Sequence, residues 1–465
     1  MLIGAETEYG IAAPGRPDAD PVALSEAVVE HVPGAATPVY EGIHSRVLGN
    51  GARLYVDHGH PEYATPETTS ASGALVAELA GDRLVAAAAA RASEELGTRI
   101  AVFKNNTDGK GASYGYHENV LLRRSTPWER VVDRLPAFLA TRVLFTGAGR
   151  LGLGPTGERP GFQLSQRADF FERLAGLDTT RNRGLINTRD EPHARPSRYR
   201  RLHVIPGDAN RNPYATWLRL GTLGLVLAAL DDDALPAIDV PAGTSPVGAS
   251  GLPDAVALFR ATSRDVGVSR VALGIQRRYL DACAAHAPAA GVPEASAVLA
   301  AWAGVLDDLG RDPASAADRV DWVAKLGLLE RLRARDGLGW DAPRLAQLDL
   351  AWAELDPARS PFAALERSGR LRTPPVPGAS TRAELGRAVE RAMAGPPRDT
   401  RAFTRGLLVA RHPDAVVALT WDSALVRDRD GVLHTLRMSD PTSWSAADVD
   451  PTWPLARIVP GPDLT

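Results

Sequence analysis

Cysteine is almost absent from this sequence, with Cys283 as the only one in 465 residues. A single cysteine excludes an internal disulfide and is typical of a protein that folds in a reducing compartment. Cys283 lies in an alanine-rich stretch of helical character, so we interpret it as a packing residue. The sequence has neither a Cys–His pair nor a GxSxG motif, so nothing in it indicates a thiol or serine nucleophile.

Long apolar runs and an excess of charge of one sign are also missing. Leu223–Leu230 is too short to cross a bilayer, and the start of the chain has no signal-peptide pattern. The formal net charge is −3, without the strongly basic balance of a dedicated nucleic-acid binder. We therefore expect a soluble, cytoplasmic protein with neither nucleic acid nor a membrane as partner.

The glycine-rich segment 146–161 has the dinucleotide fingerprint GxGxxG but lacks the helix that the fingerprint requires. The match runs from Gly147 to Gly152 and follows a predicted strand at Val143–Phe145. Pro155 and Pro160, with the glycines around them, forbid a helix at this position. No GK[ST] follows, so we predict a glycine-rich loop or hairpin instead of a phosphate-binding loop.

A row of reactive side chains is predicted along one strand. Polar residues alternate with apolar ones, so Arg53, Tyr55 and Asp57 project from the same face. We expect the strand to break at His60-Pro61 and then to present Glu62. This row is typical of the floor of a polar cleft, although the stretch alone is also compatible with the solvated face of an edge strand.

Two further segments carry groups that bind cations. Glu6 and Glu8 lie on one face of a predicted strand, and a carboxylate pair at this spacing suits Mg²⁺ or is simply two solvated acids. The polar segment Lys104–Asn119 is predicted to be a loop, and it contains His117, a candidate metal ligand. Glu118 and Asn119 could hold that histidine in place.

The remaining expected elements are helices and short strands. The helices are expected at 21–32, at 70–96 with Gly97 as the stop, at 214–230, and through 253–395 with Trp302, Trp322, Trp340 and Trp352 in the core. The strands are expected at 99–105, at 161–167 to deliver Arg167, at 200–205 with Arg201 and His203 on one face, and at 416–426 with Trp421, followed by a hairpin at Asp430-Gly431.

Together these residues favour an enzyme that uses a magnesium nucleotide. The candidate ligands for divalent cations are Glu6, Glu8, Glu62, His117 and His203. Asp57 and Tyr55 are available for attack or proton transfer. The candidates for phosphate contacts are Arg167, Arg189, Arg201, Arg401 and Arg405, since guanidinium groups suit bidentate phosphate binding. A zinc hydrolase would favour a compact motif such as HExxH, which is absent.

Several long strings resemble the Pup ligase/depupylase family, which is similar to the glutamine synthetase and carboxylate–amine ligase superfamily. They are GAETEYGI, ARLYVDHGHPEYATPE, KNNTDGKGASYGYHENVL, GFQLSQRADF, LINTRDEPHA, YRRLHVIPGDAN and TWDSA, between residue 2 and about 425. The forms VDHGHPEYATPE, NNTDGKGASYG and PTGERPGFQLSQRAD look like the depupylase branch, Dop, and less like the ligase branch.

The resemblance implies an α+β fold, in which helices back a curved, mostly antiparallel sheet that forms a cradle. It implies a glutamine synthetase-like catalytic domain at 1–396 and a small C-terminal domain at 397–465. ATP, or ADP with phosphate, would bind with Mg²⁺ in the cradle, with the adenine near Trp421. The implied metal ligands are Glu6, Glu8, Glu62, His117 and His203; the implied nucleotide contacts are Ser113, Arg167, Arg189, Arg201, Arg401, Arg405 and Trp421; the implied catalytic pair is Asp57 with Tyr55.

The implied activity is hydrolysis of the isopeptide bond between the C-terminal glutamate of Pup and lysines of pupylated proteins, with deamidation of a C-terminal glutamine of Pup. The nucleotide would be a cofactor and not a fuel. Depupylases of this family usually carry an insert before the catalytic strand, and Pro38–Asn50 leaves little room for it. Either the insert has been removed from this chain or the chain belongs to a branch without it. The alternatives are therefore an ATP phosphohydrolase, a Pup ligase, and a non-enzymatic, nucleotide-gated module that binds Pup.

Overall fold

The computed structural model describes residues 2–38, 44–238, 240, 253–428 and 430–442. The chain forms two compact units, which are interleaved along the sequence. The terminal unit comprises Leu2–Val102, Glu191–Arg200 and Val376–Thr465, and the helical unit comprises Phe103–Asp190 and Arg201–Pro375. The predicted domain boundary at 396–397 falls inside the terminal unit and remains a prediction. The expected absence of an insert concerns a segment that includes residues 39–43, which lie outside the described residues.

The terminal unit contains antiparallel strands in the order β3-β4-β5-β6-β1. These strands are β1 (Ile3–Glu8), β3 (Ala36–Pro38), β4 (Ser45–Leu48), β5 (Arg53–Asp57) and β6 (His60–Ala64), with the short β2 (Gly10–Ala12) after β1 and β7 (Ala101–Phe103) at the unit boundary. The predicted strand at 99–105 is thus shorter than expected. The predicted strands that carry Glu6, Glu8 and Asp57 are confirmed.

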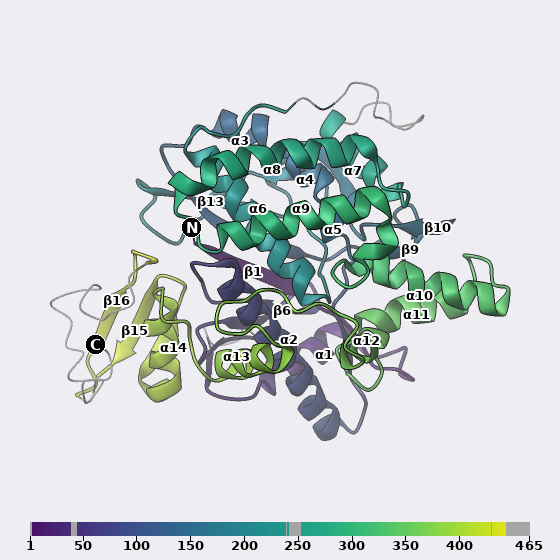
Figure 1. Cartoon of the computed structure of the whole chain (residues 1–465). Helices are drawn as coiled ribbons and strands as arrows, with labels where there is room; N and C mark the ends of the chain where they lie inside the picture. The colour runs from purple at the N-terminus through teal and green to yellow at the C-terminus, as the bar shows by residue number, and fades with distance from the viewer. Residues whose placement is uncertain (1, 39–43, 239, 241–252, 429, 443–465) are drawn as a thin grey trace. The chain divides into compact units, whose positions relative to one another are not determined.

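The terminal unit also contains helices, and the capping signals are clearest at α2 (Ala71–Leu96). The other helices are α1 (Pro21–Glu30), α13 (Arg382–Ala394) and α14 (Ala402–Arg411). The side chain of Ser70 accepts a hydrogen bond from the backbone of Gly73, and Gly97 adopts a left-handed conformation (φ 60°) that ends α2. Helix α2 packs on β1 and β6 and also contacts α1 and α13 (Figure 1).

The C-terminal part of the terminal unit is a small antiparallel sheet in the order β14-β15-β16. The strands are β14 (Val416–Leu419), β15 (Ser423–Arg427) and β16 (Leu433–Arg437), preceded by the short helix η3 (Pro413–Ala415). The predicted hairpin at Asp430-Gly431 is confirmed, but the single strand predicted over 416–426 is wrong. The hydroxyl of Thr420 accepts a hydrogen bond from the backbone N–H of Ser423 and closes a turn, so Trp421 lies between two strands.

The helical unit has its own group of strands, in the order β11-β12-β13-β8, in which β11 and β12 are parallel and β12 and β13 are antiparallel. Its strands are β8 (Tyr116–Arg123), β9 (Arg150–Leu153), β10 (Arg159–Gln163), β11 (Phe171–Gly176), β12 (Arg183–Asn187) and β13 (Tyr199–Val204), with β13 starting two residues before the unit boundary. The separate hairpin β9–β10 confirms the hairpin predicted for the glycine-rich segment. The strand predicted to deliver Arg167 ends at Gln163, four residues too early.

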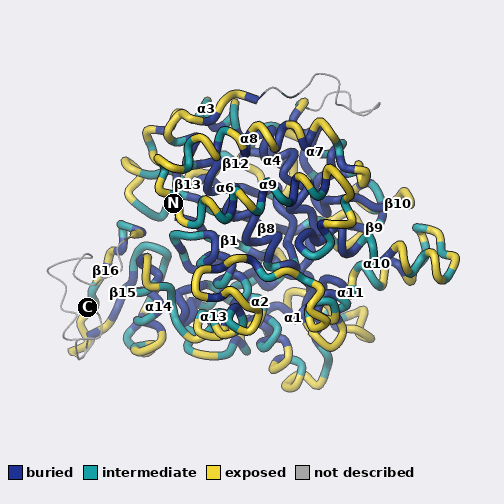
Figure 2. The backbone as a smooth tube through the Cα atoms, in the orientation of Figure 1, coloured by how far each residue is buried: buried dark blue, intermediate teal, exposed yellow. Residues whose placement is uncertain are grey.

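Most of the helical unit consists of helices. The helices are α3 (Trp128–Arg134), α4 (Pro136–Thr141), α5 (Val143–Thr146), η1 (Ala168–Phe170), α6 (Pro213–Asp231), α7 (Asp254–Arg264), α8 (Arg270–Ala290), α9 (Ala295–Arg311), η2 (Pro313–Ala316), α10 (Asp321–Asp336), α11 (Pro343–Ala353) and α12 (Pro361–Arg367). Helices α3, α5, α8 and α9 pack against α6. Among the described helices, α6 alone is long and apolar enough to cross a membrane, but 89% of its most apolar window is buried inside the structure (Figure 2). That burial is the behaviour of a core helix.

Two predictions in this unit are wrong. Val143–Phe145 was expected as a strand but lies in α5, because four consecutive buried residues have no periodicity that separates a strand from a helix. Trp340 was expected in the core but is only partly buried, whereas Trp302, Trp322 and Trp352 are buried as predicted. Cys283 is buried, which raises the pKa of its thiol to about 12 and agrees with a packing role.

Candidate functional site

A tight turn between β5 and β6 organises the acidic face of the terminal unit. The predicted break at His60-Pro61 is wrong, because both residues lie in β6. The chain turns instead at His58 (φ 47°) and Gly59 (φ 89°), a pair of positive φ values that is typical of a two-residue hairpin turn. This hairpin sets the register that places Tyr55 directly opposite Glu62.

Three neighbouring strands bring three carboxylates together. Glu62 on β6 lies opposite Tyr55 on β5 and, on its other side, opposite Glu8 on β1. Carboxylate oxygens of Glu8, Asp57 and Glu62 all lie within 4.8 Å of one another. We name these three residues the acidic cluster. Glu8 and Glu62 are buried and Asp57 is partly exposed, so water reaches only one edge of the cluster.

The acidic cluster is electrostatically costly by itself. Burial, followed by the repulsion of Glu6 and Glu8, raises the pKa of the Glu62 carboxyl well above its ordinary value. Burial and the charges of Glu62 and Glu6 likewise raise the pKa of the Tyr55 phenol, which is hydrogen-bonded to Glu62. A divalent cation would offset this repulsion, and a set of carboxylate oxygens is the donor set that Mg²⁺ prefers. The residues therefore fit the predicted metal.

Asp57 has a neighbour that sequence reasoning did not find. Its Oδ1 lies 2.7 Å from Nδ1 of His58, whose side chain is 70% exposed. His58 follows Asp57 and is the first residue of the turn. The one signal in the sequence was the His-Gly pair, which favours a turn.

Arg401 and Arg405, predicted for phosphate contacts, converge on Glu67, a residue that the sequence reading did not select. Arg401 Nε lies 2.7 Å from Glu67 Oε1, and Arg405 Nη1 lies 3.2 Å from the same oxygen, while Arg405 Nη2 bonds to Oε2. Burial by itself would raise the pKa of Glu67, but the two guanidinium groups outweigh it and lower the pKa to about 2. The arginines are therefore held in place inside the terminal unit.

Trp421 belongs to the same network. The guanidinium carbon of Arg405 lies 4.8 Å from the centre of the indole ring, and Arg405 Nη1 donates to the Trp421 carbonyl oxygen at 3.0 Å. Arg405 also donates to the carbonyl oxygen of Gly51. The carboxylate of Glu67 thus holds the guanidinium of Arg405 in place, and this guanidinium packs on one face of the Trp421 indole.

In the helical unit, His117 and His203 lie side by side on β8 and β13. The loop predicted through Asn119 is wrong at its end, because β8 already begins at Tyr116. The two rings are 4.7 Å apart in an edge-on arrangement, and His203 Nδ1 lies 2.8 Å from Asn119 Oδ1. Arg201 Nη1 donates to the same Asn119 oxygen at 3.2 Å. The predicted partnership of Asn119 thus concerns His203 and Arg201.

Glu118 points to the opposite face of β8, because side chains alternate along a strand. Its carboxylate is buried between Arg142, at 2.8 Å, and Arg219, at 3.1 Å. Two guanidinium groups on one buried carboxylate are a structural ion network. Glu118 is accordingly a packing residue and not the partner of His117 that the sequence suggested.

Arg167 and Ser113, both predicted for nucleotide contacts, meet in the helical unit. Arg167 is buried, and its Nε donates to Ser113 Oγ at 3.3 Å while Nη1 donates to the carbonyl oxygen of Ile205. Asp208 holds the preceding turn, since it accepts hydrogen bonds from the Ser165 hydroxyl at 2.9 Å and from the backbone of Gln166 at 3.0 Å. Arg189, in contrast, is exposed just after β12.

Comparison with known proteins identifies relatives over almost the whole chain. The family described as Pup-ligase protein matches residues 1–425. A Pup deamidase/depupylase of Mycobacterium tuberculosis is 39% identical over 91% of this chain and 90% of its own length. A Pup–protein ligase of Micrococcus luteus is 40% identical over 97% of both chains.

Solved structures match as well. The crystal structure of the complex between the prokaryotic ubiquitin-like protein Pup and its ligase PafA has a TM-score of 0.80 and 30% identity, over 96% of this chain and 89% of that chain. The structure of PafA in complex with ADP has a TM-score of 0.73 and 31% identity, over 90% and 88% of the two chains. These matches confirm the predicted α+β, glutamine synthetase-like fold class and the small C-terminal sheet.

Proposed function

Because this chain belongs to the Pup-ligase family, we propose that it is a nucleotide-dependent enzyme that acts on Pup, and specifically that it hydrolyses Pup conjugates. The specific reactions are cleavage of the isopeptide bond between the C-terminal glutamate of Pup and a substrate lysine, and deamidation of a C-terminal glutamine of Pup. The acidic cluster beside Tyr55 carries the proposal of an enzyme. The choice of hydrolysis over ligation rests on the depupylase-like strings around Asp57, Asp108 and Arg167.

Nucleotide binding by this chain is supported by the ADP complex of PafA, a relative with the same fold. We propose that ATP, or ADP with phosphate, binds together with Mg²⁺. Glu8 and Glu62 of the acidic cluster would hold the metal, and the other proposed ligands are Glu6, His117 and His203. Bound Mg²⁺ would neutralise phosphate and carboxylate charge.

Asp57 is the proposed catalytic carboxylate, because it is the member of the acidic cluster that solvent reaches. In either reaction a C–N bond breaks, water supplies hydroxyl to the carbonyl carbon of Pup, and the nitrogen leaves with the proton. The carboxylate of Asp57 either attacks that carbon or takes the proton from the attacking water. Tyr55, hydrogen-bonded to Glu62, stays protonated and is the proposed proton donor at this face.

The remaining site residues are proposed to hold the nucleotide. Arg167 with Ser113, together with Arg189 and Arg201, would serve the phosphates. Arg401 and Arg405 are both engaged with Glu67, so we propose that they act mainly by stabilising this part of the site. Arg405 would hold Trp421, against which the adenine would stack.

Pup ligation is the second candidate function, and two observations favour it. Two of the solved structures that match are those of the ligase PafA. The ligase of Micrococcus luteus aligns over 97% of both chains, whereas the depupylase of Mycobacterium tuberculosis aligns over 91% of this one. The second observation fits a chain in which the depupylase insert is missing.

One experiment separates the candidates. The purified chain would be incubated with Mg²⁺ and ATP, first with a Pup-conjugated protein, then with Pup that ends in glutamine, and then with Pup that ends in glutamate plus an unmodified protein. We expect free Pup from the first mixture, ammonia from the second, and no conjugate from the third. Conjugate formation would establish a ligase, and ADP formation without any change in Pup would establish a phosphohydrolase. Asp57→Asn is the inactive control.

A further inference from the structure

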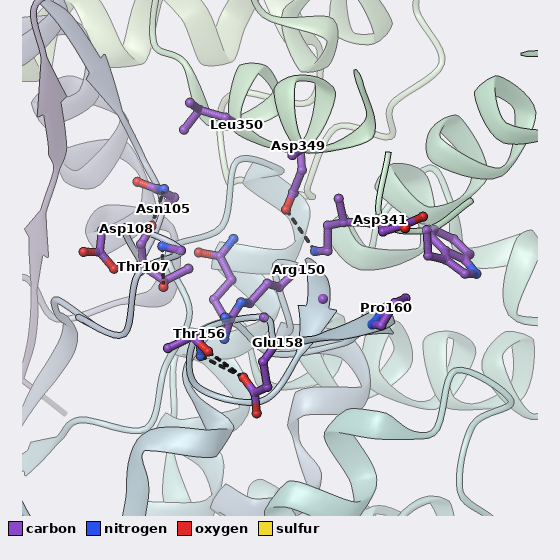
Figure 3. A pocket seen from close by; sticks show the side chains of 17 residues that line it. Asn105, Thr107, Asp108, Arg150, Thr156, Glu158, Pro160, Asp341, Asp349 and Leu350 are labelled. Carbon is purple, nitrogen blue, oxygen red and sulfur yellow. Dashed lines mark hydrogen bonds between the residues drawn. The ribbon is translucent and has the colours of Figure 1, made fainter. Parts of the chain in front are cut away.

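The helical unit contains a pocket that none of the proposed functions uses. It has a volume of about 460 Å³ and lies between the loop that follows β7, the β9–β10 hairpin, and helix α11 with the preceding Trp340 (Figure 3). This volume is within the range of about 300–1,000 Å³ that is typical of ligand sites. We name it the hairpin pocket.

The glycine-rich segment forms one wall of the hairpin pocket. A Cβ at Gly152 (φ 83°) would lie 2.8 Å from the Cα of Gly157, so the hairpin closes on itself only with glycine there. Arg150 Nη2 donates to the carbonyl oxygen of Pro155 at 3.0 Å and fastens the tip of the hairpin to its base. The motif that imitates a dinucleotide fingerprint thus holds an arginine in position.

The opposite wall is fixed to the hairpin by ionic contacts. Asp349 of α11 accepts a hydrogen bond from the backbone of Leu151 at 2.9 Å and pairs with Lys325 at 2.8 Å. Lys325 and Gln166 both donate to the carbonyl oxygen of Gly149. The hairpin pocket is therefore preformed and does not depend on a ligand for its shape.

Arg150 supplies an unused donor in the pocket. The residue is only 3% exposed, its guanidinium ends between the segments of Thr107 and Thr156 (Figure 3), and its buried Nη1 has no hydrogen-bond partner in the described structure. Burial lowers the pKa of Arg150, and nearby carboxylates, Asp169 foremost, only partly offset this effect. A buried donor without a partner is unfavourable, and a ligand oxygen that accepts a hydrogen bond from it would remove that cost.

The rim excludes an anion as that ligand. The carboxylates of Asp108, Glu158, Asp341 and Asp349 line the pocket together with the single guanidinium of Arg150. Asp349 is paired with Lys325, and Glu158 accepts a hydrogen bond from Thr156. Asp341 is exposed, and its side chain makes no hydrogen bond or ion pair among the described residues. A neutral oxygen is thus favoured at Arg150, and a cation is favoured at the rim.

The cationic ligand that the rim favours is not a single metal ion. Asp108 and Asp341 stand on opposite sides of the pocket (Figure 3), and neither belongs to any group of described acids or histidines that is compact enough to share one ion. A ligand with spaced charges is required. Between these acids, Trp340, Leu151 and Leu350 offer apolar surface for aliphatic chain.

We propose that the hairpin pocket binds a short basic segment of polypeptide, whose main-chain carbonyl oxygen accepts from Arg150 Nη1 and whose lysine side chains lie along Trp340 and Leu350 towards the carboxylates of the rim. Lysine combines an aliphatic stem with a terminal cation and so matches both features. This inference goes beyond the proposed function and does not depend on it.

Calorimetric titration of the whole chain with three peptides tests the proposal. The probes are acetyl-Gly-Lys-Gly-Lys-Gly-amide and its counterparts with glutamine and with glutamate in place of lysine, in the presence of Mg²⁺ and ADP. We expect the lysine peptide to bind at least about 10-fold more tightly than the glutamine peptide, and the glutamate peptide not to bind up to about 10 mM. Equal binding of the lysine and glutamine peptides, or no binding at all, would overturn the proposal.

Two exposed carboxylates provide a matched pair of variants that should both fold. Asp341→Asn should lower the affinity for the lysine peptide by about 3–10-fold. Asp178→Asn, outside the pocket, should leave that affinity unchanged. Equal losses in both variants would place the peptide elsewhere and refute the pocket. Arg150→Met should lower the affinities for the lysine and glutamine peptides by the same factor, since it removes only the contact with the main-chain carbonyl oxygen of the peptide. Inorganic phosphate that binds with dependence on Arg150, without binding of the lysine peptide, would identify an anion site and contradict the proposal.

Discussion

Buried charges are arranged differently in the two parts of the terminal unit. Glu67 is surrounded by guanidinium groups, which stabilise its ionised form, whereas Glu62 is surrounded by other carboxylates, which destabilise it. The first arrangement contributes to folding. The second costs folding energy and is typical of a site that holds a cation or a substrate.

Asp57 should be essential for turnover but not for nucleotide binding. The Asp57→Asn substitution keeps an oxygen donor in the acidic cluster and removes the charge that attack or proton transfer requires. We expect the rate of Pup release to fall by about 100-fold or more, with a change of less than about threefold in the Kd for ATP. Single-turnover assays and nucleotide titration measure the two quantities. Near-normal turnover would remove Asp57 from the catalytic role.

Glu67 should make stability depend on pH in acid. Its pKa is about 2 in the folded protein against an ordinary value of 4.5, so its ionised form stabilises the fold above pH 4.5, and this contribution is lost as the pH falls towards 2. Glu67→Gln should therefore cost about 3 kcal/mol of unfolding free energy at pH 7 and much less near pH 3.

Denaturant unfolding of the Glu67→Gln variant at several pH values measures this difference. The exposed Glu172→Gln is the control and should differ little from the parent protein at any pH. A loss in Glu67→Gln that is as large at pH 3 as at pH 7 would show that the two arginines do not act on the charge of Glu67.

At the scale of elements, the helices and strands follow local signals where capping and alternation are clear. Helix α2 begins after Ser70 and ends at Gly97 as expected, and β5 carries its polar row as predicted. Long-range contacts decide where local signals conflict or are absent. Helix α5 is an example, since a short apolar run fits a buried strand or a buried helix equally well.

The packing of α2 on β6 depends on one glycine. A Cβ at Gly81 would lie 2.2 Å from Cδ1 of Tyr63, inside any possible contact distance. We expect Gly81→Ala to destabilise the protein by about 1–3 kcal/mol through overpacking, although alanine favours helices.

Gly274 in α8 is the matched control, because a Cβ there meets nothing within 4 Å. Gly274→Ala should stabilise the protein by up to about 1 kcal/mol. Thermal unfolding of both variants measures the two effects, and a stabilised Gly81→Ala would show that the helix and the strand can separate without cost.

At the scale of the whole molecule, the proposed binding of Mg²⁺ would link ligand binding and folding through the acidic cluster. Glu8, Asp57 and Glu62 repel one another in the free protein, and a bound divalent cation would turn the same arrangement into a stabilising one. Stability should therefore depend strongly on Mg²⁺ and nucleotide.

Glu62→Gln tests this linkage. In EDTA the variant should melt at a higher temperature than the parent, because one buried repelling charge is gone. With Mg²⁺ and ATP the parent should gain roughly 5 °C, and the variant should gain almost nothing. Differential scanning calorimetry measures both, with Glu172→Gln as the control. An unchanged response of Glu62→Gln to Mg²⁺ would exclude Glu62 as a metal ligand.

The sequence by itself determined which side chains share a face, because the period of two along a strand is a local property. It therefore identified Tyr55 with Asp57, and Glu6 with Glu8, as groups on one face. Local strings also sufficed for the family resemblance. They did not show that Glu67 pairs with Arg405, since that contact joins residues more than 300 positions apart.

Only the tertiary structure decided which faces meet. The register of β1, β6 and β5 brings carboxylate oxygens of Glu8, Glu62 and Asp57 within 4.8 Å of one another. That register follows from the turn at His58-Gly59, two residues before the break that the sequence predicts. Likewise, the glycine-rich segment was predicted to be a hairpin, but its role as the wall of a pocket around Arg150 depends on α10 and α11. Pairing partners and pockets depend on the packing of distant segments, which no local pattern encodes.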